Sequence, residues 1–140
     1  MPKVKNFISR SEEDTCSYAC KFALGLKGGE CIALRGDLGA GKTVFAKGLA
    51  KGLGVPDIVT SPTFIIMNVY EGGRLKFYHF DMYRIDAAQA EFLGFSEIFG
   101  EKGAVCLIEW PENVKSMLPA NTIEIEIKRI DENTREIIYG

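Results

Sequence analysis

The chain has 140 residues, 46% of them hydrophobic, and a formal net charge of -2. This length leaves room for one domain over residues 1–140, and the apolar share is enough to build its core. With 17 basic and 19 acidic residues, composition excludes a strongly basic surface that would bind a polyphosphate backbone unaided. No run approaches about 18 apolar residues and no signal-peptide core follows the start, so we expect a cytoplasmic protein without membrane contact.

The four cysteines do not form a metal-binding pattern. They contain no C-x-x-C pair, and the chain has a single histidine. Cys16 and Cys20 share a helical face, whereas Cys31 and Cys106 lie in apolar runs typical of strands. We therefore expect four reduced, small hydrophobic residues in the core.

The first elements are a strand and a helix. Residues 5–9 are a short predicted strand. Ser11 is a good helix-start residue, and Asp14 three positions later is a weaker form of the usual capping-box partner. We expect this helix to end at Gly28 and Gly29.

A buried strand and a second helix follow. Residues 31–34 are an apolar run between glycines, typical of a parallel strand buried on both faces. After a glycine-rich turn, apolar positions recur every four residues from Lys42, which predicts a helix that Gly54 and Pro56 terminate.

The second half of the chain continues this alternation. Residues 64–70 and 75–80 predict a hairpin, and residues 87–99 a third helix. Residues 104–108 repeat the buried-strand pattern and end at Glu109, next to the first buried strand in our prediction.

The C-terminal segment alternates apolar and charged residues over 123–128, turns at 131–134 and returns, which predicts a second hairpin with one solvated face. Buried parallel strands separated by helices, with two hairpins, predict an α/β fold with a mixed sheet flanked by helices. The glycine-rich motif in the turn after residue 34 makes the predicted fold one of the P-loop nucleotide hydrolase type.

The strongest motif is a complete G-x-x-x-x-G-K-T between the first buried strand and the second helix. Glycines let backbone N–H groups surround phosphate oxygens, and the helix start adds roughly half a positive charge. Lysine at this position would reach the β- and γ-phosphates, and threonine would place its hydroxyl on Mg²⁺. The motif predicts an ATP and Mg²⁺ site formed by Gly36, Asp37, Leu38, Gly39, Ala40, Gly41, Lys42 and Thr43.

Two acids at strand ends are candidates for the metal and for catalysis. Glu109 ends the apolar run 104–108, and Asp81 ends another largely apolar run. A carboxylate beside a triphosphate is repelled unless a divalent cation lies between them. We therefore expect both acids around Mg²⁺, with one also orienting or activating the attacking water. A strand-end acid that caps a neighbouring helix is the structural alternative for each.

Three further residues have less specific signals. Thr63 lies on a loop where a hydroxyl would sense the γ-phosphate, or is a turn residue before a strand. His79 lies on a strand beside aromatic residues, which favours packing over catalysis. Trp110, directly after Glu109, fits either the core or a partner-binding rim.

Together these segments resemble the TsaE family, small bacterial ATPases of tRNA threonylcarbamoyladenosine biosynthesis. The resemblance extends from Thr15 to Arg135. It rests on the P-loop together with the runs Ser-Pro-Thr-Phe at 61–64, His-Phe-Asp-Met-Tyr-Arg at 79–84, Leu-Ile-Glu-Trp-Pro-Glu at 107–112 and Leu-Pro at 118–119.

The resemblance implies roles for individual residues and partners. It places Mg²⁺ on Thr43 and Glu109, makes Asp81 the other acid of the active site, and associates Thr15 and the neighbourhood of Arg135 with the nucleotide. It also implies an accessory ATPase, slow alone, that acts with a TsaB–TsaD heterodimer and meets tRNA only indirectly through that complex.

Two other functions compete with this interpretation. A small-metabolite or nucleoside kinase would share the P-loop, but the arginines after it are thinly spread and do not predict a lid. A nucleotide-gated binding module would bind without hydrolysis, and the absence of an N-K-x-D motif counts against GTP as its ligand.

Overall fold

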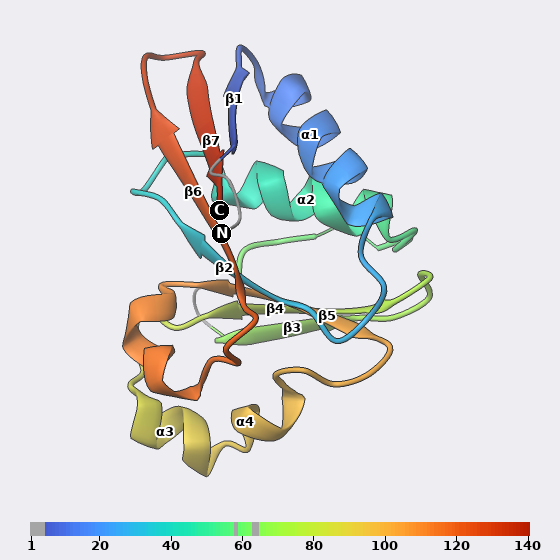
Figure 1. Cartoon of the computed structure of the whole chain (residues 1–140), viewed down its shortest axis with the longest axis vertical. Coiled ribbons are helices and arrows are strands. Elements are labelled where there is room, and N and C mark those ends of the chain that lie inside the picture. Colours follow the sequence, from blue (N-terminus) through green and yellow to red (C-terminus); the bar gives the residue numbers. More distant parts are fainter. Residues whose placement is uncertain (1–4, 58, 63–64) are drawn as a thin grey trace.

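One mixed β-sheet organises the part of the chain that the computed structural model describes, residues 5–57, 59–62 and 65–140 (Figure 1). Its strand order is β1-β7-β6-β2-β5-β4-β3. The strands are β1 (Lys5–Ser9), β2 (Cys31–Arg35), β3 (Met67–Tyr70), β4 (Lys76–Asp81), β5 (Ala104–Glu109), β6 (Ile123–Arg129) and β7 (Arg135–Tyr139). The helices are α1 (Glu12–Leu24), α2 (Lys42–Gly52), α3 (Ala87–Phe92), α4 (Phe95–Ile98) and the 3₁₀ helix η1 (Pro111–Met117).

The centre of the sheet is parallel and its margins are antiparallel. β2 pairs in parallel with β5 and with β6, and β5 pairs in parallel with β4. β3 pairs antiparallel with β4, and β7 lies antiparallel between β6 and β1. The predicted α/β class, the pairing of the two apolar strands and both hairpins are confirmed.

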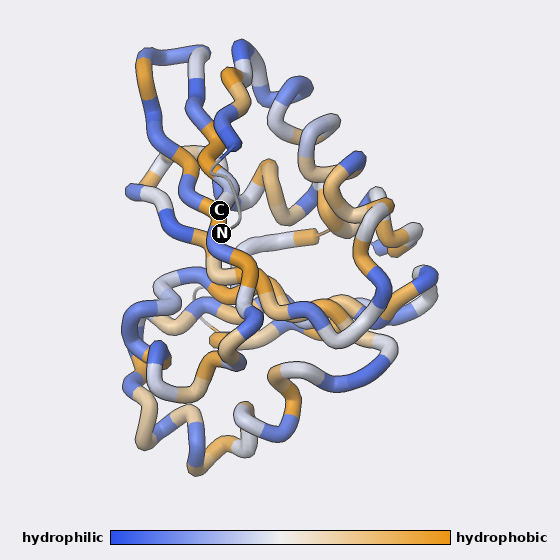
Figure 2. The backbone as a smooth tube through the Cα atoms, in the orientation of Figure 1, coloured by the Kyte–Doolittle hydropathy of each residue, from blue (hydrophilic) through white to orange (hydrophobic). Residues whose placement is uncertain are grey.

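Two apolar clusters lie on opposite faces of this sheet. Along β4, Phe77 belongs to the cluster that contains α1 and α2, while Tyr78 and Phe80 belong to the cluster under α3, α4 and η1. Successive strand residues point to opposite faces, so one strand contributes to both layers. Figure 2 shows the complementary pattern on β6, where hydrophobic and hydrophilic residues alternate.

The two long helices pack closely because α2 carries glycines every four residues. A Cβ atom on Gly48 would lie 2.9 Å from the Cβ of Ala19, and it would also collide with the carbonyl oxygen of Cys16. A Cβ atom on Gly52 would lie 2.6 Å from the Cβ of Ala23. The glycines thus allow α1 to approach the backbone of α2, which starts at the glycine-rich loop.

The first helix is shorter than expected. Helix α1 ends at Leu24 rather than at Gly28 and Gly29. The carboxylate of Glu30 accepts hydrogen bonds from the amides of Lys27 and Gly28 at 2.8 and 2.7 Å, so these residues form a turn that leads into β2. The start is as predicted, since the Ser11 side chain accepts from the amide of Asp14.

The predicted third helix is divided. Gly94 has φ of +79°, a left-handed conformation that separates α3 from α4. The N-terminal strand of the first hairpin starts at Met67 rather than at residue 64, because Ile66 has φ of +69° and breaks the extended backbone. Residue 64 itself lies outside the described residues.

The cysteine prediction is correct in part. All four are free, and Cys31 and Cys106 are buried side by side on β2 and β5. Cys16 and Cys20 are only half-buried, because α1 is the outer helix of its layer. Among the described helices, none has the length and apolar character needed to cross a membrane.

Candidate nucleotide-binding site

The glycine-rich loop joins the C-terminal end of β2 to the start of α2. Gly39 and Gly41 have φ of +81° and +106°, which glycine adopts without strain, and no side chain caps α2. Gly36 is required for space, because a Cβ atom there would lie 2.9 Å from the carbonyl oxygen of Ile127. The uncapped N–H groups at the helix start and the open loop above them form a cradle that fits an anion.

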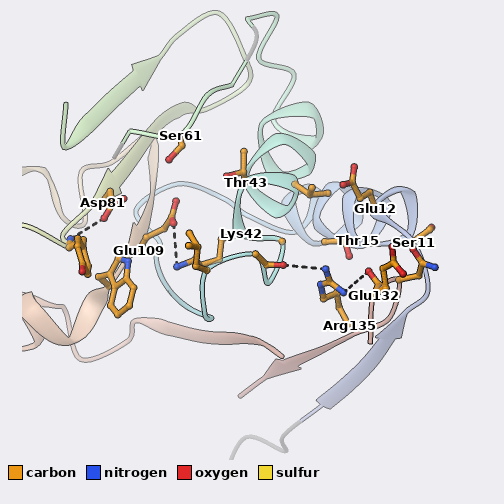
Figure 3. A pocket seen from close by; sticks show the side chains of 17 residues that line it. Ser11, Glu12, Thr15, Lys42, Thr43, Ser61, Asp81, Glu109, Glu132 and Arg135 are labelled. Atoms are coloured by element: carbon orange, nitrogen blue, oxygen red, sulfur yellow. Dashed lines mark hydrogen bonds and ion pairs between the residues drawn. The ribbon is translucent and has the colours of Figure 1, made fainter. Parts of the chain in front are cut away.

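A cavity of about 720 Å³ opens over this loop (Figure 3). It brings together the N-terminus of α1, the loop, the ends of β4 and β5, and the turn between β6 and β7. Its lining residues are Ser11, Glu12, Thr15, Leu38, Gly39, Gly41, Lys42, Thr43, Val44, Ser61, Asp81, Tyr83, Glu109, Trp110, Glu132, Asn133 and Arg135.

Most residues predicted for the site line this cavity. Gly36 and Asp37 instead line a second cavity of about 560 Å³, which shares Lys42 and Trp110 with the first, and Ala40 is buried. Thr63 lies outside the described residues.

The two candidate acids are neighbours across the sheet. Asp81 and Glu109 are paired positions at the ends of the parallel strands β4 and β5, and each is only 5% exposed. Phe77 and Asp81 are four residues apart on β4, so both point to the face covered by α1 and α2. The sheet register therefore directs both carboxylates toward the start of α2.

Lys42 contacts Glu109, the last residue of β5, and Trp110, which follows it. Its Nζ lies 3.7 Å from Oε1 of Glu109 and 4.8 Å from the centre of the Trp110 ring (Figure 3). The Lys42 and Glu109 side chains are 10% and 6% exposed, so water screens their charges weakly. The ammonium group of Lys42 is thus balanced by the carboxylate of the acid that was predicted to hold the metal.

Asp81 has a structural contact in addition to its place in the cavity. Its Oδ1 accepts a hydrogen bond from the amide of Tyr83 at 2.9 Å, and the Tyr83 ring lies 5.0 Å from that of Trp110. The acid therefore holds the turn after β4 against the residue that follows Glu109. The helix-cap alternative does not describe this contact, because the amide belongs to a turn.

Arg135 reaches the cavity from the first position of β7. Its Nε donates to the carbonyl oxygen of Ala40 at 3.0 Å and Nη2 to that of Gly39 at 3.2 Å. Its Nη1 donates to the carbonyl oxygens of Asp131, Glu132 and Thr134. The guanidinium thus connects the β6–β7 turn to the glycine-rich loop through hydrogen bonds to backbone carbonyl oxygens.

Thr15 lies at the far end of the cavity from the acids. It is 2% exposed, and its hydroxyl is 2.6 Å from that of Ser9. Ser11, which was predicted only as a helix start, and Glu12 line the same end, and neither was predicted to belong to the site. Both residues lie at the predicted start of the first helix, where side chains of the first turn surround the exposed N–H groups. This position is the feature of the sequence that could have indicated them.

His79 was expected to pack, and it is fully buried, with its ring stacked 5.9 Å from that of Phe77. Packing is not its only contact, because its Nε2 lies 2.6 Å from Oε2 of Glu109. The spacing in the sequence could have indicated this contact, because His79 precedes Asp81 by two residues on a strand and both side chains point to the same face of the sheet. Trp110, for which two roles were open, lies at the rim of the cavity, half-buried.

The oxygen donors around the loop fit a magnesium ion that also binds phosphate. Magnesium sites of nucleotide-binding proteins use one or two protein carboxylates or hydroxyls, and phosphate and water supply the other ligands. Thr43, Asp81 and Glu109 offer such a set in the cavity. Among the described residues there is no cluster of three His, Cys, Asp or Glu side chains that could hold a metal ion.

The fold and the site define an α/β protein of the P-loop class, in which a glycine-rich loop links a central parallel strand to a helix. Residues 9–137 match the family described as "Threonylcarbamoyl adenosine biosynthesis protein TsaE". The chain belongs to this family, whose members act in the biosynthesis of threonylcarbamoyladenosine in tRNA.

Relatives and a solved structure agree with this assignment. The chain is 45% identical over 127 residues to the TsaE protein of Bacillus subtilis, covering 91% of this chain and 79% of the relative. It is 44% identical over 139 residues to that of Aquifex aeolicus, covering 98% and 96%. The crystal structure of Bacillus subtilis YdiB has a TM-score of 0.86 and 40% identity, covering 99% of this chain and 86% of that one.

Proposed function

We propose that this protein binds ATP with Mg²⁺ and hydrolyses it, as an accessory ATPase that supports the threonylcarbamoylation of tRNA adenosine next to the anticodon. The observation that carries the proposal is the meeting of Lys42, Asp81 and Glu109 above an uncapped helix start. A glycine-rich turn with no ligand would not need two buried acids and a buried lysine around it.

Phosphate binding uses the loop and Lys42. The backbone N–H groups of the loop and the start of α2 would bind phosphate oxygens, to which the helix adds its partial positive charge. Lys42 would exchange its contact with Glu109 for the β- and γ-phosphates. This exchange replaces one negative partner by another, so the lysine stays neutralised in both states.

Thr43, Glu109 and Asp81 would hold Mg²⁺, directly or through water. When bound, the ion neutralises charge on the phosphates. Asp81 and Glu109 lie side by side, so one can contact the ion while the other accepts a hydrogen bond from the attacking water. Their burial keeps these carboxylates away from bulk water, which strengthens both interactions.

The rest of the nucleotide would extend along the cavity toward Thr15. Arg135 contributes mainly by holding the loop, because it binds the carbonyl oxygens of Gly39 and Ala40. Thr63 remains our candidate for sensing the γ-phosphate, on the strength of its position in the sequence after Pro62.

A TsaB–TsaD heterodimer is the proposed partner, and tRNA would be met indirectly through that complex. The net charge of -2 supports this division, because it leaves the polyphosphate contacts to other subunits. Hydrolysis by the chain alone is expected to be slow, since P-loop sites often need a partner to complete the γ-phosphate environment.

The test is ATP hydrolysis by the purified chain with and without TsaB and TsaD, with Mg²⁺ and with EDTA. We expect Mg²⁺-dependent hydrolysis that the two partners stimulate. Phosphorylation of a nucleoside at rates well above hydrolysis would instead favour a kinase. ATP binding without turnover, even with both partners, would favour a nucleotide-gated binding module.

A further inference from the structure

The buried end of Glu109 is occupied by a histidine. Nε2 of His79 lies 2.6 Å from Oε2 of Glu109, and Oε1 of the same carboxylate faces Nζ of Lys42 at 3.7 Å. His79 is fully buried on β4, the neighbour of β5, so its ring cannot leave this position without opening the core. The two carboxylate oxygens of Glu109 thus have different environments, one inside the protein and one at the cavity.

The hydrogen-bond pattern defines which nitrogen donates. A carboxylate only accepts hydrogen bonds, so Nε2 of His79 carries the hydrogen that points to Glu109. Nδ1, on the other side of the ring, is the buried side-chain atom without a hydrogen-bond partner among the described residues. The ring therefore has one directed polar contact, and that contact is Glu109.

Packing alone does not explain a histidine here. Its ring stacks on that of Phe77, two residues earlier on the same face of β4, and an apolar side chain would fill the same space. A buried ring with one unpaired nitrogen is less favourable than such a side chain. The compensating feature is the short hydrogen bond to Glu109, which identifies what the histidine adds.

We propose that His79 is a positioning residue that holds Oε2 of Glu109 inside the protein and so presents Oε1 to Lys42 and to the magnesium–nucleotide complex. The inference rests on the proposed function, because it assigns His79 a role through the acid of that site. Hydrogen-bonding partners of metal-binding side chains fix the ligand orientation, and their loss costs about 10- to 100-fold in metal affinity or activity.

The experiment is a double-mutant cycle of His79→Leu and Glu109→Ala, with Phe77→Leu as the packing control and His79→Gln as the conservative variant. The only tryptophan, Trp110, lies at the site and reports binding of AMP-PNP, a non-hydrolysable ATP analogue, by its fluorescence. The measured quantity is the gain in AMP-PNP affinity on adding Mg²⁺. Thermal unfolding of each nucleotide-free variant and hydrolysis by each variant are measured alongside.

We expect His79→Leu to reduce the Mg²⁺-dependent gain about 10-fold or more, while the affinity without Mg²⁺ changes by less than about 3-fold. His79→Gln should recover most of the gain, since its amide also donates. In the Glu109→Ala background, His79→Leu should cause no further loss. Phe77→Leu should lower the unfolding temperature and leave the gain unchanged.

Two results would overturn the inference about His79 and leave the proposed function intact. One is that His79→Leu reduces the Mg²⁺-dependent gain in the Glu109→Ala background by the same factor as in the wild type. The other is that Phe77→Leu reduces this gain as much as His79→Leu does. Failure of the proposed function has a different signature. There, Glu109→Ala would keep the full Mg²⁺-dependent gain and wild-type hydrolysis, which removes Glu109 from the site and the role of His79 with it.

Discussion

The guanidinium of Arg135 donates a hydrogen bond from Nε to the backbone carbonyl oxygen of Ala40 at 3.0 Å. This contact joins the last strand of the sheet to the glycine-rich loop, and a second contact to Gly39 reinforces it. The two contacts fix the orientation of these peptide groups, and the N–H group of Ala40 donates to the carbonyl oxygen of Asp37 at 2.9 Å within the loop. The C-terminal hairpin is therefore part of the site, although it contains no residue of the loop motif.

Arg135→Ala should weaken nucleotide binding by roughly 10-fold, because hydrogen bonds from a charged donor contribute about 1.5–3 kcal/mol and the loop loses this restraint. Arg135→Lys should recover little of the affinity, since an ammonium cannot bind both loop carbonyls and the turn at once. Isothermal titration with ADP measures both. Wild-type affinity in Arg135→Ala would show that the loop holds its conformation unaided.

Lys42→Ala should weaken ATP binding by roughly 100-fold and abolish turnover, because the phosphates lose their cation and Glu109 loses its partner in the cavity. Lys47→Ala, an exposed lysine on the same helix, is the matched control and should bind as wild type. Titration of Trp110 fluorescence gives both affinities. Equal binding by the two variants would exclude Lys42 from phosphate recognition.

Two substitutions of Asp81 separate its charge from its hydrogen bond. Asp81→Asn keeps an oxygen that can accept from the amide of Tyr83, whereas Asp81→Ala keeps neither. Both should reduce hydrolysis about 10- to 100-fold and spare nucleotide binding. Only Asp81→Ala should also lose roughly 1 kcal/mol of stability, seen as a lower thermal midpoint. Unreduced hydrolysis in Asp81→Asn would assign Asp81 to the turn alone.

Gly48→Ala should destabilise the protein by about 2 kcal/mol or more, because the new methyl group would overlap the backbone of α1 and the Cβ of Ala19. Gly25→Ala is a suitable control. A Cβ atom there would make only an ordinary contact, 3.6 Å from the carbonyl oxygen of Phe22. Urea denaturation compares the two, and equal midpoints would mean that α1 and α2 separate at little cost.

The β6–β7 turn contains a pH-dependent contact. The amides of Asn133 and Thr134 donate to Oδ1 of Asp131 at 2.9 Å each. The hydrogen bond from Asn133, followed by those from Thr134, holds the pKa of Asp131 below its ordinary value of 3.8. Because the pKa is lower in the folded state, the carboxylate stabilises the fold at any pH above its pKa in the unfolded chain. This stabilisation is lost as the pH falls through the pKa of the folded state.

Asp131→Asn tests this sign, because it keeps an acceptor and removes the titrating charge. Its urea midpoint should lie below that of the wild type at neutral pH, and the difference should shrink below pH 3.8. A difference that stays constant over this range would contradict the assignment.

Local patterns in the sequence were sufficient to predict the glycine-rich loop, the buried strands and the two acids. The G-x-x-x-x-G-K-T motif identified the loop, and apolar runs identified β2 and β5, since burial on both faces requires continuous apolar residues. Asp81 and Glu109 were found because each ends such a run. Two helix boundaries were predicted wrongly, the end of α1 and the division between α3 and α4. Gly94 has a positive φ, which separates α3 from α4, and the residues next to it in the sequence do not require that conformation.

Contacts between residues far apart in the sequence depend on the order of the strands in the sheet. His79 and Glu109 are 30 residues apart, and Arg135 and Ala40 are 95 apart. The first pair depends on β4 and β5 being neighbours in register, and the second on β7 lying between β1 and β6. Strand order is set by the packing of the whole sheet, so the apolar periodicity of a single segment does not predict it. For that reason the sequence located the acids and the loop, while their supporting contacts became visible only in the fold.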